Sequence, residues 1–114
     1  MFKSKKKNIE DLVDKLDLNS IEQDMVDKHK WSYNKTWKIS KEYREFLILV
    51  GKNPNQSIVP WSQDLDDFWH QHILDTRKYI QDCMDIFGHI VHHDPNTAKN
   101  PIKHKEADRK TTVS

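Results

Sequence analysis

The sequence predicts an all-α fold, and three observations support that prediction. Glycine is scarce, with two in 114 residues. Apolar residues recur at spacings of three, four and seven along most of the chain, which is the helical period. An alternating strand pattern never extends beyond a few residues. We expect a compact bundle of about four helices around one long central helix, with disordered basic ends.

The central helix is predicted to run from Asp64 to Gly88. Its apolar residues recur at helical spacings and therefore lie on one side. They are Leu65, Trp69, Ile73, Ile80, Cys83 and Phe87. Asp64 can cap the N-terminus, and Gly88 ends the pattern as a C′ glycine does. About 24 residues at 1.5 Å each give a helix about 36 Å long, enough to cross a small domain.

The N-terminal part of the chain predicts a hairpin of two short amphipathic helices. Asn8 can cap the first of them. The apolar face of this first helix consists of Ile9, Leu12, Val13 and Leu16. Ser20 and Gln23 form a capping-box pattern at the start of the second helix, ahead of Met25 and Val26.

A third helix is predicted after Ser32, which can cap its N-terminus. Its buried face is expected to consist of Trp37, Tyr43, Phe46, Leu47 and Val50. Gly51 is a good terminator for this helix. The Asn53-Pro54-Asn55 sequence favours a turn, and Pro60 excludes helix from the link that follows.

Composition predicts one domain with polar ends. Hydrophobic residues make up 35% of the chain and charged residues 32%, so we expect some residues to lie outside the core. We assign residues 1–7 to a disordered basic arm, 8–95 to a helical domain and 96–114 to a flexible tail. A basic arm can contact nucleic acid or an acidic protein, and the alternative is a solubilising end.

Three features predict a cytoplasmic protein. No apolar run approaches the ~20 residues of a membrane span. No hydrophobic signal-peptide segment follows the basic start. The chain has one cysteine, which excludes an internal disulfide and fits a reducing compartment.

One motif is specific enough to compare with a known family. It reads Asp66-x-x-Trp69-His70-x-His72-Ile73-Leu74-x-Thr76-x-x-Tyr79-x-x-Asp82-Cys83-x-x-x-Phe87-Gly88. Tyr43-x-x-Phe46-Leu47 precedes it and His92-His93-x-Pro95 follows it. With these residues the chain resembles the glycine-rich domain-containing protein-like family, in its bacterial stand-alone form, over residues 15–95.

The resemblance implies domain boundaries rather than an activity. In the bacterial pattern of that family, an aromatic residue and a glycine-containing loop that ends in acidic residues follow the proline. Here Asn96-Thr97-Ala98-Lys99-Asn100 follows instead. If that loop completes a site in the family, this chain has lost or reworked it.

A metal site is one functional hypothesis, because histidine, cysteine and carboxylate are the ligands of zinc and iron. The candidate ligands are His70, His72, His89, His92 and His93. In a continuous helix His70 and His72 point about 200° apart, and His72 and Cys83 lie about 16 Å apart along the axis. A site would therefore combine one of them with another segment, such as the pair His89 and His93, spaced i and i+4.

The alternative is that these residues are structural. His70 can pair with Asp66, His72 can be a hydrogen-bonded core histidine, and Cys83 can pack as a small hydrophobe. A catalytic role for Cys83 as a nucleophile needs an electropositive setting. Asp82 beside it raises the pKa of a thiol instead. Whether the chain is an enzyme stays open, and the sequence favours a non-enzymatic role.

The sequence favours a small cytoplasmic protein–protein interaction module of the adaptor or inhibitor type. The chain contains four tryptophans. Either all four belong to the core, or one or two are exposed, where tryptophan is enriched at binding hot spots. The alternative function is a metal-binding protein with hydrolytic or redox chemistry. Nucleic acid is not an expected partner, because no phosphate loop, zinc-finger spacing or RNA-binding aromatic pattern is present.

Overall fold

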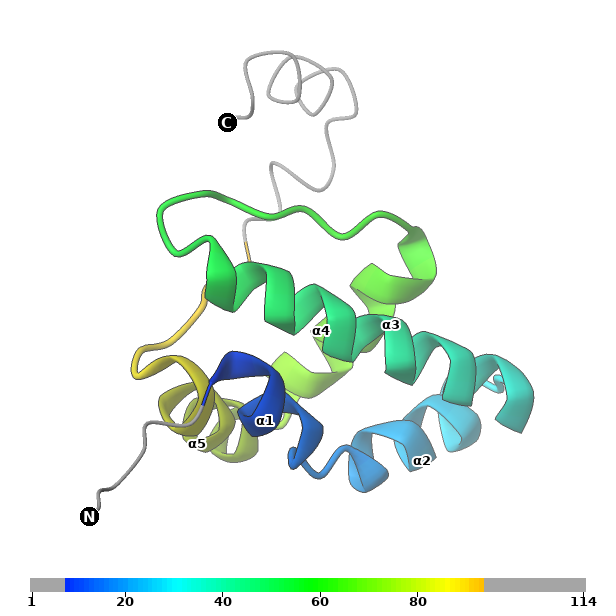
Figure 1. Ribbon diagram of the computed structural model, residues 1–114. Helices are drawn as coiled ribbons and strands as arrows, with labels where there is room; N and C mark the ends of the chain where they lie inside the picture. The colour runs from blue at the N-terminus through cyan, green and yellow to red at the C-terminus, as the bar shows by residue number, and fades with distance from the viewer. Residues whose placement is uncertain (1–7, 94–114) are drawn as a thin grey trace.

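The computed structural model describes residues 8–93, and within them the chain forms five α-helices (Figure 1). The helices are α1 (Ile9–Asp14), α2 (Asn19–Asp27), α3 (Tyr33–Lys52), α4 (Gln63–Leu74) and α5 (Thr76–Phe87). No strand occurs among these described residues, and the predicted all-α class is confirmed. The predicted arm, residues 1–7, and the predicted tail, residues 96–114, lie outside the described residues.

Three helices begin at a side-chain cap. Asn8, Ser32 and Ser62 each accept a hydrogen bond from the backbone N–H three residues later, at 2.9, 3.1 and 3.1 Å. Such caps satisfy one of the unpaired N–H groups of the first turn. The caps Asn8 and Ser32 confirm the predictions. The predicted cap Asp64 is wrong, because α4 begins one residue before it and is capped by Ser62.

The second helix starts without a side-chain cap. Its N-cap residue is Leu18, so the predicted capping box from Ser20 to Gln23 is wrong. Leu18 is buried in the core, which fixes the chain at this point. The side chain of Asp17 accepts instead from the backbone N–H of Asn19, at 2.9 Å. Burial of an apolar side chain therefore takes precedence over the local capping pattern.

The helix predicted from Asp64 to Gly88 is two helices rather than one. Asp75 separates α4 from α5 with φ −87° and ψ 77°, outside the helical region. His72 and Asp82, which a straight helix would separate by about 15 Å, lie within hydrogen-bond distance. A straight helix could not bring the buried faces of both halves against the same core, which is the physical reason for the break.

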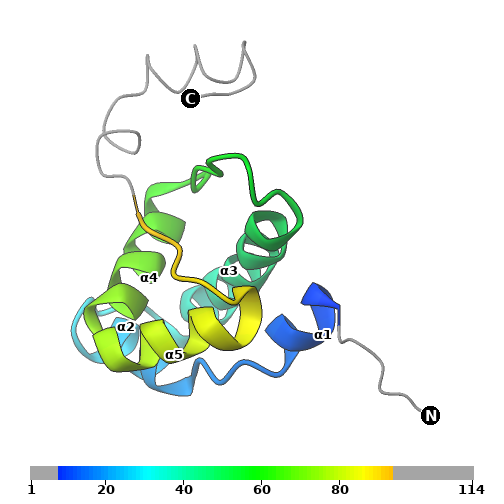
Figure 2. The ribbon, with the colours of Figure 1, turned by 90° about the vertical axis from the view of Figure 1, so that its left-hand side faces the viewer.

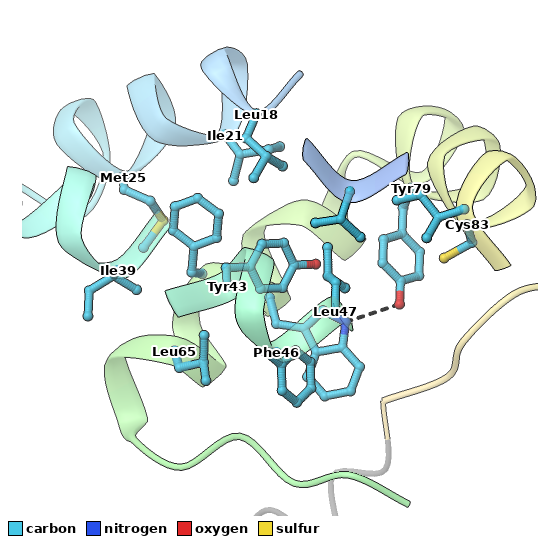
Figure 3. Packing of buried hydrophobic residues seen from close by; sticks show 14 residues of the cluster. Leu18, Ile21, Met25, Ile39, Tyr43, Phe46, Leu47, Leu65, Tyr79 and Cys83 are labelled. Carbon is cyan, nitrogen blue, oxygen red and sulfur yellow. Dashed lines mark hydrogen bonds between the residues drawn. The ribbon is translucent and has the colours of Figure 1, made fainter. Parts of the chain in front are cut away.

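The helices enclose one hydrophobic core. Helix α3 packs against α1, α2 and α4, while α4 also contacts α2 and α5, and α5 closes against α1 (Figures 1 and 2). The buried hydrophobic residues are Val13, Leu18, Ile21, Met25, Ile39, Tyr43, Phe46, Leu47, Leu65, Phe68, Trp69, Tyr79, Cys83 and Ile86. Tyr43 lies near the middle of this cluster, between Met25 of α2 and Tyr79 of α5 (Figure 3).

The two glycines have different roles. Gly51 was predicted to end the third helix, but it lies inside α3, which ends at Lys52. A Cβ at Gly51 would come within 2.6 Å of the Ile9 side chain. The missing side chain therefore allows α1 to pack closely against α3. Gly88 has φ 79° and ends α5 in the left-handed region, which confirms its predicted role.

Two non-helical segments lie on one side of the bundle. The link 53–62 joins α3 to α4, and residues 89–93 follow α5 (Figure 2). Residues 56–60 and 91–93 line a common hollow, so the two segments are neighbours. Within the part of the chain that the structure describes, no helix has the length and apolar content that a membrane span requires.

Two side chains predicted for the core are exposed instead. Trp37 is 64% exposed and Ile80 is 46% exposed. The face of α3 that meets the core carries Tyr43, and Trp37 lies beside that face. In α5 the break at Asp75 changes the register, so that Tyr79 and Ile86 face the core and Ile80 does not.

The register of α5 is testable with two isoleucines of the same helix. Ile86→Ala should lower the free energy of unfolding by about 2–4 kcal/mol, because Ile86 is buried. Ile80→Ala should lower it by less than about 1 kcal/mol, because Ile80 is 46% exposed. Urea denaturation of both variants provides the measurement. A larger loss of stability for Ile80→Ala than for Ile86→Ala would contradict this register and support the single continuous helix predicted from the sequence.

Candidate functional site

His72 lies at the centre of a buried chain of hydrogen bonds. Its side chain is 1% exposed. Nδ1 lies 2.8 Å from the hydroxyl oxygen of Tyr43 in α3, and Nε2 lies 2.8 Å from Oδ2 of Asp82 in α5. In the tautomer with the proton on Nε2, the Tyr43 hydroxyl donates to Nδ1 and the Nε2–H donates to Asp82. Both ring nitrogens contact protein partners, as in the structural alternative for His72, a hydrogen-bonded core histidine.

Asp82 connects this series of hydrogen bonds to the protein surface. The Nζ of Lys78, one helical turn earlier, lies 3.0 Å from the same carboxylate oxygen that contacts His72. Burial acts to raise the pKa of Asp82, but the bonds from His72 and Lys78 outweigh it and hold the pKa below its ordinary value. At the other end, burial raises the pKa of Tyr43, so its hydroxyl stays protonated. The series of hydrogen bonds therefore begins at the neutral phenol of Tyr43 and ends at the ionised carboxylate of Asp82.

A second chain of hydrogen bonds joins α4, α5 and the segment after α5. The indole N–H of Trp69 donates to the hydroxyl of Tyr79 at 3.0 Å, marked by the dashed line in Figure 3. The Tyr79 hydroxyl donates in turn to the backbone carbonyl of Val91. The ring of Tyr79 also meets the imidazole of His72 edge-on, with centroids 4.9 Å apart. These contacts place the two series of hydrogen bonds side by side in the core.

His93 attaches the end of the described chain to α4. Its Nε2 contacts a carboxylate oxygen of Asp66, and its ring lies 4.4 Å from the ring of Trp69. The motif residues Asp66 and Trp69 therefore hold a histidine from outside the long motif. Together with the bond from Tyr79 to Val91, these contacts fasten residues 91–93 along α4.

Cys83 belongs to the packed core rather than to an exposed reactive setting. It is 2% exposed. Burial raises the pKa of its thiol, and the nearby Asp82 carboxylate acts in the same direction. Since the thiolate is the reactive form, this environment does not favour a nucleophilic cysteine.

The remaining candidate residues lie at the surface or end a helix. His70, Thr76, His89 and His92 are exposed, and Gly88 ends α5. His72 directs both nitrogens to protein partners, and His93 directs one to Asp66. Among residues 8–93, no group of three or more His, Cys, Asp or Glu side chains is arranged to hold a metal ion. The hypothesis of a zinc or iron site therefore gains no support from this part of the chain.

Sequence reasoning missed three contacts of the buried cluster: Tyr43 with His72, Lys78 with Asp82, and Tyr79 with the carbonyl of Val91. Tyr43 was placed in the core by its helical spacing, but its partner His72 is 29 positions away and no local pattern pairs them. Lys78 and Asp82 are spaced i and i+4, a signal that was present in the sequence. The carbonyl of Val91 carries no sequence signal, because every residue has one.

The buried cluster cannot act directly on a substrate from solution. Tyr43 is fully buried and His72 is 1% exposed, so neither side chain meets solvent. A Tyr–His–Asp chain has the groups for proton transfer, but a catalytic group must reach the reacting atoms. The cluster therefore stabilises the fold.

A groove lies between α2 and α3 at the surface. Its volume is about 480 Å³. The lining residues are Asn19, Glu22, Gln23 and Val26 from α2, with Tyr33, Asn34, Thr36 and Trp37 from α3. Tyr33 is 72% exposed and Trp37 is 64% exposed, one turn apart on α3. We name this feature the α2–α3 groove.

The groove combines aromatic surface with nearby positive charge. The Nζ of Lys41 lies 4.3 Å from the centroid of the Trp37 ring, a cation–π contact. The carboxylate of Glu22, which lines the groove, accepts from the hydroxyl of Ser40 and keeps its negative charge. Lys38 is exposed next to Trp37. Trp37 therefore has one lysine over its ring and an exposed lysine next to it in the sequence.

Two smaller hollows lie elsewhere. One, of about 120 Å³, is bounded by residues 56–60, Trp69 and residues 91–93. The other, of about 210 Å³, lies between α1 and α5 and reaches Lys78 and Asp82. Neither exposes an aromatic pair, and the first is too small for more than a single side chain.

Comparison with known proteins establishes a family. The chain belongs to the UCP032817-like family, whose model matches residues 8–112. This finding corrects the resemblance to the glycine-rich domain-containing protein-like family. Of the motif that suggested it, Trp69, His72, Tyr79, Asp82 and Cys83 are buried. The searches of curated proteins and of solved structures gave no match.

The carboxylate of Asp82 should contribute stability in a pH-dependent way. Asp82→Asn should lower the free energy of unfolding at pH 7 by about 1–3 kcal/mol, because His72 and Lys78 lose a charged partner. A carboxyl whose folded pKa is lowered contributes stability above its unfolded pKa, about 3.9, and loses it as pH falls through the folded pKa. The difference between variant and wild type should therefore shrink below about pH 4.

Chemical denaturation at neutral and acid pH measures this effect. The matched control is Asp85→Asn on the same helix, where the carboxylate is exposed and accepts only from Gln81. It should change stability by less than about 0.5 kcal/mol at either pH. Equal losses for Asp82→Asn and Asp85→Asn would contradict the assigned role.

The Tyr79 hydroxyl should hold the segment after α5 in place. Tyr79→Phe removes the donor to Val91 and the acceptor for Trp69, and should cost about 1–3 kcal/mol. Amide hydrogen exchange in residues 89–93 should become faster by more than the global loss of stability explains. Tyr33→Phe, at a 72% exposed tyrosine, serves as the control. Unchanged exchange in Tyr79→Phe would show that Val91 is held by packing alone.

Proposed function

We propose that this protein is a small protein–protein interaction module of the adaptor or inhibitor type. It binds an extended segment of a partner protein in the α2–α3 groove. The observation that carries this proposal is the pair Tyr33 and Trp37, which stand 72% and 64% exposed beside a hollow of about 480 Å³.

Aromatic residues in this setting are suited to binding. Tyrosine and tryptophan bury about 150–250 Å² each on contact, more than most side chains. Both lose little conformational entropy when they are fixed, because each has two rotatable side-chain bonds. Trp37 and Tyr33 leave much of this surface in solvent in the free protein. Burial of this apolar surface against a partner would remove it from water and contribute favourably to the free energy of binding.

The walls of the groove are fixed before a partner arrives. Ser40 of α3 donates to Glu22 of α2, so a polar bond joins the two walls. The hydroxyl of Thr36 donates to the carbonyl of Ser32, which holds the first turns of α3. Beneath the groove, Ile21 and Met25 are fully buried. A preorganised groove loses less entropy on binding than one that must form around its ligand.

We also propose a cytoplasmic location for this interaction. The lone cysteine, Cys83, is compatible with a reducing compartment because it needs no disulfide partner. A nucleic-acid partner has less support, since the groove contains a carboxylate and amides rather than a row of cationic side chains.

The proposal is tested by selecting ligands from an unbiased random peptide library with the full chain and measuring their dissociation constants. Trp37→Ala should weaken binding at least about 30-fold, as expected for a hot-spot tryptophan. Leu49→Ala should leave binding unchanged, because Leu49 is 42% exposed on the same helix but does not line the groove. Circular dichroism of both variants would show that the helices are intact.

The result has a definite interpretation. Peptides that require Trp37 but not Leu49 support a binding role for the α2–α3 groove. If no peptide is selected, or if selected peptides bind wild type and Trp37→Ala equally well, the proposed function is wrong.

A further inference from the structure

We infer that the segment bound in the α2–α3 groove is proline-rich, adopts the polyproline II conformation and carries acidic residues beside its prolines. This inference rests on the proposed function and names the class of partner that the groove recognises. Three independent properties of the groove lead to it: the shape of its aromatic surface, its hydrogen-bond donors and the charges at its edge.

The aromatic surface favours a rigid extended ligand over a helix. An amphipathic helix binds by inserting apolar side chains from successive turns into an apolar groove. Val26 is the one aliphatic side chain that lines this groove. The groove therefore lacks the apolar surface that an amphipathic helix would need. Tyr33 and Trp37 instead present flat rings about one helical turn apart. Polyproline II segments dock against aromatic-lined grooves of this kind, because proline rings pack on flat aromatic faces.

The hydrogen-bonding groups of the groove also match such a segment. A polyproline II backbone has no internal hydrogen bonds, so its carbonyls need external donors. The side-chain amides of Asn19, Gln23 and Asn34 line the groove, and each carries two N–H donors. One donor of Gln23 is used by Asp27, at 3.0 Å. Proline contributes no N–H, so such a segment needs few acceptors in the groove. The carboxylate of Glu22 accepts from Ser40 and can serve the few N–H groups that the segment does carry.

The charges at the edge favour acidic residues in the ligand. Lys38 and Lys41 follow Trp37 on the solvent side of α3, and Lys41 lies over the Trp37 ring. Glu22 and Glu42 accept from neutral donors, the Ser40 hydroxyl and the Trp61 indole N–H, and keep their negative charge. The acidic residues of the ligand are therefore expected at Lys38 and Lys41 and not beside Glu22. A carboxylate placed next to a proline on Trp37 would therefore face a lysine. The attraction is between exposed charges, so it should weaken with added salt.

The test compares peptide arrays of equal length on the full-length protein. One array carries Pro-x-x-Pro with aspartate or glutamate at flanking positions, a second replaces both prolines by alanine, and a third replaces the acids by lysine. The unbiased random library is selected in parallel. Binding is measured by the change in tryptophan fluorescence and by calorimetry, with wild type, Trp37→Ala and the double variant Lys38→Glu/Lys41→Glu.

The acidic proline array should contain ligands that bind at least about ten-fold more tightly than their alanine and lysine counterparts. Trp37→Ala should abolish this binding, and Lys38→Glu/Lys41→Glu should reverse the preference from acidic to lysine-containing peptides. Since these side chains are exposed, the variants should remain folded.

Other outcomes separate the inference from the proposed function. If the random library yields Trp37-dependent peptides without proline, the groove binds but the inference about its ligand is overturned. If proline peptides bind without a preference for acids, the charge argument is overturned. If no peptide binds in a Trp37-dependent way, both the inference and the proposed function fail.

Discussion

The fold depends on hydrogen bonds that cross the break between α4 and α5. His72 and Asp82 on one side, and Trp69 and Tyr79 on the other, are each ten positions apart in sequence and in direct contact in space. Buried polar groups destabilise a protein unless they are paired, and paired groups in a low-dielectric core strengthen one another. Straightening the chain at Asp75 would separate both pairs at once. The break is therefore a requirement of the polar core.

The same bonds connect segments that would otherwise be independent. Tyr43 brings α3 to His72, and the carbonyl of Val91 brings the segment after α5 to Tyr79. His93 then reaches Asp66 at the start of α4. A mutation at the centre of this cluster should therefore act on distant parts of the fold, whereas a mutation in the α2–α3 groove should not. The buried cluster and the α2–α3 groove are therefore separate regions of one small domain.

The residue types of the motif explain why it suggests a metal or catalytic site. Histidine, cysteine and carboxylate serve both in metal centres and in buried hydrogen-bond clusters. The two cases differ in where the lone pairs and N–H groups point. In His72 both nitrogens face protein partners, and Cys83 faces the core. The large aromatic side chains that are exposed are instead Tyr33, Trp37 and Trp61, and the first two belong to the N-terminal part of α3, at the other end of the molecule from residues 89–93 (Figure 1).

The sequence by itself determined the all-α class, the start of two helices and the glycine that ends α5. Each of these depends on local physics: helical spacing of apolar residues, a serine or asparagine cap, and the freedom of Gly88 to adopt positive φ. Only the tertiary structure decided the break at Asp75, the exposure of Trp37 and the pairing of Tyr43 with His72. Helical spacing is the same for one long helix and for two helices that meet at an angle. The choice between them is made by contacts between residues far apart in the chain, which no local pattern contains.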